Sequence, residues 1–135
     1  IYYLDGQFSQ ALKTLESACG MIPDDPECLF YIGRTQMELG NLAEASDNLL
    51  KLTRQRPDFT QAYYFLGQSL GQQQKLGDAH YYLGVFHLRK RDFKNAEIQF
   101  KQALKYQQDD ERRKKINEWL SKMSGNDKKQ SKSGG

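Results

Sequence analysis

Two histidines and two cysteines are the side chains of this 135-residue sequence whose types suggest metal, redox or nucleophilic chemistry. His80 and His87 stand seven residues apart, so on one helix they share a side but lie two turns apart. Zinc ligands must converge to about 2 Å from the metal, and neighbouring turns do this better. We therefore expect no metal and no other cofactor, with His80 in a packing position and His87 partly exposed.

The cysteines leave two interpretations open. Cys19 and Cys28 flank a Pro-Asp-Asp-Pro turn, which would bring them near each other. In an oxidising compartment such a pair forms a disulfide. The interpretation that we favour from sequence is two small buried thiols.

Motifs for catalysis are absent from the sequence. It has no H-E-x-x-H, no G-x-S-x-G and no G-x-x-x-x-G-K-[ST]. We therefore expect no enzymatic activity from these residues themselves.

Positive charge is concentrated at the C-terminus. Lys plus Arg number 20 against 17 Asp plus Glu, and residues 105–135 hold nine basic and five acidic side chains. A solvated helix face followed by a disordered basic tail over 124–135 explains this pattern. An anionic partner is the alternative, but no aromatic residue interleaves with the tail lysines and no nucleic-acid motif is present, so we expect no nucleic-acid partner.

The elements that position these residues are helices. Only ten residues are Val, Ile or Thr, so a β fold is disfavoured, and no apolar run reaches the roughly 18 residues of a membrane span. The expected helices are a fragment at Ile1–Leu4 that ends at Asp5-Gly6-Gln7, and then 8–20, 26–39, 42–55, 60–73, 77–90, 93–107 and 110–123.

A 34-residue period organises the chain. With Pro26 at position one, Leu29, Gly33, Ala45 and Leu49 fall at positions four, eight, twenty and twenty-four. A shift of 34 gives Tyr63, Gly67, Ala79 and Leu83, and a shift back gives Ala11 and Leu15. Small residues at fixed positions let two helices approach closely, and bulky ones fill the gap between them.

This pattern resembles the tetratricopeptide repeat, a helix–turn–helix unit of 34 residues. The resemblance implies an all-α superhelical solenoid over 1–123 and a function in protein–protein interaction. Its expected parts are a truncated repeat at 1–25, a full repeat at 26–59, an irregular repeat with a half-repeat at 60–110, and a capping helix at 111–123. We expect Ile1–Leu4 to be the last turn of a first helix whose beginning is missing, so that the array was cut from a longer protein.

The register breaks after the second unit. Gly33 and Gly67 are 34 residues apart, but the next Leu-Gly pair, Leu83-Gly84, follows after only 17. Helix 77–90 is therefore both the second helix of one unit and the first helix of the next. We expect inner and outer helices to exchange roles there, with a change of superhelical path near 72–78.

The resemblance also implies a binding surface. First-helix positions two, five, six, nine, twelve and thirteen line the concave groove of this family. Carried onto this sequence, they predict a groove for an extended peptide or a partner helix whose contacts are Phe30, Arg34, Met37, Tyr64, Gln68 and Tyr81. The carboxylate clamp of chaperone-binding members is missing except at Arg34, because Phe30, Phe65, Asp78 and Tyr82 stand where the clamp has Lys, Asn, Lys and Arg.

Residues 60–123 resemble a more specific arrangement. The stretches Leu76–Gly84 and Arg89–Ala96 are similar to the C-terminal repeats of bacterial β-barrel assembly-enhancing zinc metalloproteases. That resemblance implies a periplasmic accessory domain which docks on outer-membrane assembly machinery. The alternative is a scaffold of another bacterial assembly, such as a pilus, secretion or signalling complex, with a cytoplasmic location. The oligomeric state is left open.

Overall fold

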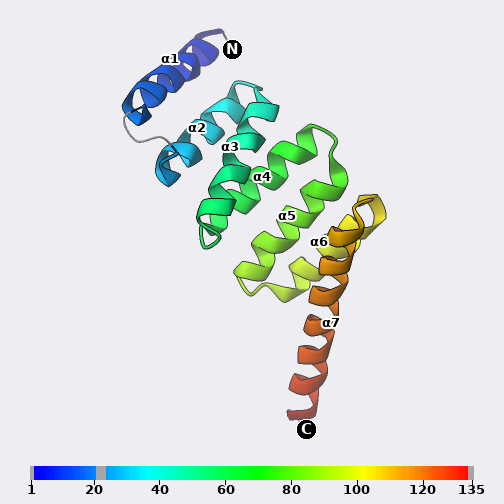
Figure 1. Cartoon of the computed structure of the whole chain (residues 1–135). Coiled ribbons are helices and arrows are strands. Elements are labelled where there is room, and N and C mark those ends of the chain that lie inside the picture. The colour runs from blue at the N-terminus through cyan, green and yellow to red at the C-terminus, as the bar shows by residue number, and fades with distance from the viewer. Residues whose placement is uncertain (1, 21–23, 134–135) are drawn as a thin grey trace.

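The computed structural model describes residues 2–20 and 24–133, and all regular structure in these ranges is helical (Figure 1). Each helix packs chiefly on its neighbours in sequence, so the helices form a stack. The predicted all-α solenoid is confirmed. The helices are α1 Tyr2–Cys19, α2 Pro26–Glu38, α3 Leu42–Gln55, α4 Thr60–Gln72, α5 Leu76–Arg89, α6 Phe93–Tyr106 and α7 Asp110–Ser133.

Three helix pairs share the same close contact. A Cβ atom built on Gly33 would lie 2.9 Å from Cγ of Leu49, and one on Gly67 would lie 2.7 Å from Cγ of Leu83. One on Gly84 would lie 2.5 Å from Cδ1 of Phe100. The pairs α2–α3, α4–α5 and α5–α6 are therefore packed at the spacing that the repeat predicts, and α5 takes part in two of them.

The turns show the same shortened spacing. Gly40, Gln74 and Arg91 have left-handed backbones with φ of 81°, 63° and 60°. Each follows a helix closed by the same amide-to-carbonyl bond, for example Lys75 N to Leu70 O and Asp92 N to His87 O, both 2.9 Å. The turns after α4 and after α5 are thus of one kind, which confirms the double role of α5. The expected change of superhelical path stays a prediction.

Both ends differ from the sequence prediction. α1 is continuous through Asp5-Gly6-Gln7, and α7 continues to Ser133 instead of ending near residue 123. An isolated glycine costs a helix only about 1 kcal/mol, and adding residues to an existing helix is far easier than nucleating one. The predicted break in α1 and the predicted disorder from residue 124 as far as Ser133 are therefore wrong. Residues 1, 134 and 135 lie outside the described residues.

α7 covers the end of the array. Ile116 and Met123 are buried, and the Trp119 ring lies 5.1 Å from Phe100 and 5.8 Å from Tyr81, measured between ring centroids. The predicted capping role of this helix and the packing role of Trp119 are confirmed.

The cysteines are joined. Cys19 and Cys28 form a disulfide with their Cα atoms 5.9 Å apart, and both side chains are half-buried. The expectation of two buried thiols is wrong, because the connection between α1 and α2 brings the end of one helix beside the first turn of the other. The bond ties α1 to the rest of the stack.

Candidate partner-binding groove

An aromatic pocket of about 630 Å³ lies where α2, α4 and α5 meet. α4 and α5 pack side by side (Figure 1), which sets the start of α4 against the end of α5. Tyr64 therefore meets Phe86 at 5.3 Å and Phe65 at 5.3 Å between ring centroids. We call this pocket the α2–α4–α5 groove, and its lining is Arg34, Thr60, Gln61, Tyr64, Phe65, Phe86, Arg89 and Lys90.

Three cations of the groove lie on aromatic faces. The Arg34 guanidinium carbon is 4.7 Å from the centre of the Phe65 ring, and Lys90 Nζ is 5.1 Å from that of Phe86. Arg89 lies 5.2 Å from the centre of Tyr63. Among the described residues, none of the three forms an ion pair with a carboxylate. The groove therefore presents positive charge beside exposed aromatic surface.

Two carboxylates that feel the charge of Arg89 or Lys90 are already engaged with other groups. Asp58 accepts two hydrogen bonds from Arg56, which is the main cause that lowers the pKa of Asp58. Asp92 accepts from the side chain and the backbone amide of Asn95, and these bonds lower the pKa of Asp92. Neither aspartate lines the groove.

The predicted contact residues are only partly brought together. Arg34 and Tyr64 line the groove, with Tyr64 39% exposed. Phe30 is buried beneath it, 4.9 Å from Phe59 and 5.6 Å from Phe65 between ring centroids, so its predicted role as a direct contact is wrong. Met37 and Gln68 are half-buried and lie outside the lining.

Tyr81 is also misplaced by the sequence prediction. It is buried, packs against Trp119 of α7 and lines a separate cleft between α3 and α7. Tyr81 stands near the start of α5, whereas the α5 residues that line the α2–α4–α5 groove stand at the end of this helix. The face of α5 that does reach the groove carries Phe86, Arg89 and Lys90. The sequence prediction missed Phe86 and Lys90, although their spacing of four residues places them on one helix face.

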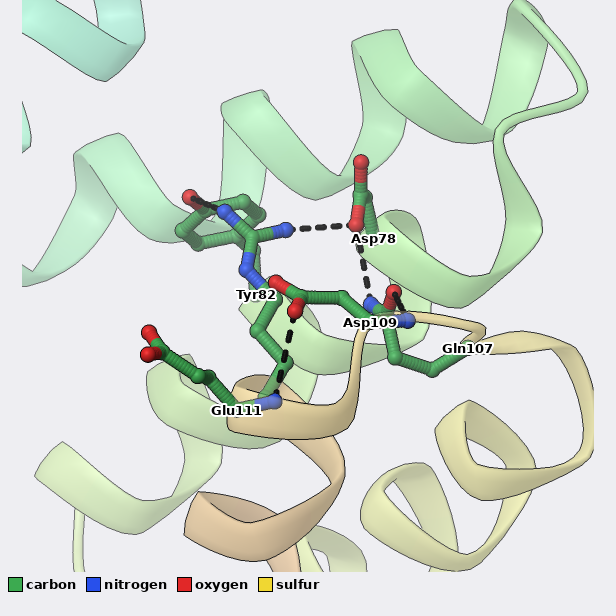
Figure 2. Close-up of polar contacts among 6 residues, drawn as sticks. Asp78, Tyr82, Gln107, Asp109 and Glu111 are labelled. Atoms are coloured by element: carbon green, nitrogen blue, oxygen red, sulfur yellow. Dashed lines mark hydrogen bonds and ion pairs between the residues drawn. The ribbon is translucent and has the colours of Figure 1, made fainter.

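A polar cluster joins the start of α7 to the start of α5 (Figure 2). Arg112 donates to Asp78 and, at 2.9 Å, to the Tyr82 hydroxyl. Gln107 also donates to Asp78, at 2.9 Å, and the backbone amide of Glu111 donates to Asp109 at 3.2 Å. The cluster holds α7 across α5, so we assign it a structural role.

The histidines are engaged with neighbouring polar groups. His80 Nδ1 is 2.8 Å from Gln99 Oε1, and His87 Nδ1 is 3.6 Å from Asp92 Oδ2. Within the described ranges, no group of three or more His, Cys, Asp or Glu side chains is placed to hold a metal ion. In the same ranges, no helix is both long and apolar enough to cross a bilayer.

Comparisons with known proteins agree with this architecture. Family models of the tetratricopeptide repeat match residues 2–68 and 77–110, and the second match is the unit expected from the half-repeat. A crystal structure of MamA matches with a TM-score of 0.52 and 17% identity, over 96% of this chain and 94% of that one. MamA 41-end from Desulfovibrio magneticus RS-1 matches with a TM-score of 0.51 and 18% identity, over 93% and 88%. These likenesses concern the fold alone, and no curated protein matches the chain significantly.

Proposed function

Because the chain belongs to the tetratricopeptide repeat family, we propose that it is a protein-binding scaffold which holds a segment of a partner protein in the α2–α4–α5 groove. The observation that supports this site is the exposed Tyr64 in a pocket floored by Phe65 and Phe86. Aromatic residues in concave, partly apolar sites dominate the binding energy of protein interfaces.

The test compares two tyrosines. Tyr64→Ala removes the centre of the groove, whereas Tyr106→Ala removes a similarly exposed tyrosine of α6 that lies outside it. Capture from an extract of the source organism should lose a partner with the first variant and keep it with the second. Equal capture by both variants would move the binding site elsewhere.

The finer proposal concerns the whole protein. We propose a periplasmic accessory domain of a zinc metalloprotease that docks on outer-membrane assembly machinery. The Cys19–Cys28 disulfide supports an oxidising compartment. The half-repeat followed by a terminal helix supports the resemblance from which the protease role comes.

Two observations test this finer proposal. The cysteines should resist alkylation in intact cells until a reductant is added, and the coding sequence upstream should carry H-E-x-x-H. Free thiols in cells would contradict the periplasmic location. An upstream sequence containing only further repeats would favour a scaffold of another assembly.

A further inference from the structure

We propose that the segment held in the α2–α4–α5 groove is acidic and carries one large apolar side chain between its carboxylates. This inference rests on the proposed function, because it names the chemistry of the partner at the same site. It follows from the charges and the apolar surface of the lining.

The requirement for an apolar side chain in the partner follows from the aromatic lining of the groove. Tyr64, Phe65 and Phe86 form a continuous aromatic surface, with neighbouring ring centroids 5.3 Å apart. The buried Phe30 ring packs against Phe65, with their ring centroids 5.6 Å apart. A large apolar side chain of the partner covers this surface and removes it from water.

The acidic requirement comes from the rim. Arg34, Arg89 and Lys90 supply three positive charges, and the only other polar side chains of the lining besides the Tyr64 hydroxyl are Thr60 and Gln61. No carboxylate belongs to the lining. Stacking on an aromatic face leaves the edge N–H groups of a guanidinium available to a carboxylate, which arginine binds in a two-pronged geometry.

The helix dipole does not account for all three cations. Arg89 and Lys90 stand at the C-terminal end of α5, where the helix dipole favours positive charge. Arg34 lies within α2, more than a turn from its end, so this effect does not place it there. Arg34 and Lys90 thus lie on rings that line the groove, and Arg89 joins the same lining from beside Tyr63.

α5 supplies three residues of the lining. Phe86, Arg89 and Lys90 reach the groove because α5 packs on α4 as a second helix. A second copy of the chain is a poor occupant, since the formal net charge of the chain is +3. The charge of the groove selects a partner of opposite sign.

Selection from a random library of displayed 12-residue peptides tests the inference. The baits are the parent chain and Tyr64→Ala. We expect peptides that depend on Tyr64 to be enriched in Asp and Glu around one aromatic or large aliphatic residue. Tyr64-dependent peptides that are neutral or basic would overturn the acidic inference and leave the proposed function standing. Enrichment that does not depend on Tyr64, or no enrichment at all, would overturn both.

The best selected peptide then allows a quantitative check by fluorescence anisotropy. Arg34→Gln and Arg89→Gln should each weaken binding about tenfold or more, the loss expected for one hydrogen bond to a charged group. Lys105→Gln, an exposed lysine of α6 outside the groove, is the control of equal charge change and should leave the affinity unchanged. Replacing the peptide's Asp and Glu by Asn and Gln should abolish the salt dependence. Equal affinity of both peptides would contradict the inference.

Discussion

Arg112 is the residue that connects α7 to the array. Burial acts to lower its pKa, but neighbouring groups, the Asp78 carboxylate among them, outweigh burial and raise it, so the guanidinium stays charged. Burial raises the pKa of Tyr82, so this hydroxyl stays neutral and accepts the hydrogen bond from Arg112. The guanidinium also lies 4.9 Å from the centre of the Tyr81 ring. One side chain therefore fixes the start of α7 against α5.

Replacing this residue should loosen α7. Arg112→Gln leaves Asp78 without its charged partner, so we expect the free energy of unfolding to fall by about 2 kcal/mol. Lys115→Gln, an exposed neighbour in α7, should change it by less than about 0.5 kcal/mol. Urea denaturation measures both values. An equal effect of the two variants would contradict the assigned role of Arg112.

Asp92 gives a prediction for the acid range. Its hydrogen bonds from Asn95 lower its pKa below the ordinary 3.8, so the folded state binds the proton less readily than the unfolded state. The stabilisation is present at neutral pH and is lost as the pH falls below about 4. Asp92→Asn does not titrate, so its thermal midpoint should fall less between pH 5 and pH 3 than that of the parent. Parallel pH profiles would exclude this contribution.

At the scale of elements, α5 is a helix with two partners. Its adjacent residues Leu83 and Gly84 contact Gly67 of α4 and Phe100 of α6. This arrangement removes one helix from the regular alternation. The end of α5 completes the α2–α4–α5 groove, while residues near its start contact α7.

A methyl group on Gly84 tests this packing. The added Cβ would lie 2.5 Å from the fully buried Phe100 ring, so Gly84→Ala should destabilise the fold by about 1–3 kcal/mol. In Gly71→Ala the new Cβ makes an ordinary contact at 3.7 Å from Ala79, and we expect a gain of about 0.5–1 kcal/mol. Thermal unfolding distinguishes them, and a neutral Gly84→Ala would show that α5 and α6 are not so closely packed.

The disulfide determines how firmly α1 is held. Of the other helices, α1 makes its main contact with α2. A double Cys19→Ser and Cys28→Ser variant should lose about 2–4 kcal/mol of local stability in α1. Amide exchange should therefore accelerate in α1 and stay unchanged in α4 and α5. Unchanged protection of α1 would contradict this role of the bond.

The period of small and bulky residues was sufficient to predict the helices and the double role of α5. It was not sufficient for Phe30, which neighbouring rings bury within a regular unit, or for Tyr81, which packs against Trp119 of α7. Nor did it predict the disulfide or the end of α7. The spacing of two cysteines does not specify whether their side chains meet in the geometry of a disulfide. Polar composition does not exclude a helix that continues from a packed segment.

At the scale of the whole molecule, the two ends of α5 have separate roles. Its start contacts Arg112 and Trp119 of α7, the helix that closes the array. Its end meets α2 and α4 around Tyr64, where aromatic surface and positive charge are exposed. We infer that the scaffold binds at the end of α5 and is stabilised at its start.

Site-specific photo-crosslinking in cells of the source organism tests this account most directly. The photoreactive residue benzoylphenylalanine replaces Tyr64 in the groove. As the control, it replaces Tyr106 on α6. We predict a discrete crosslinked partner from position 64 and none from position 106. A partner captured only from position 106, or equally from both, would contradict the claim that the α2–α4–α5 groove is the binding site.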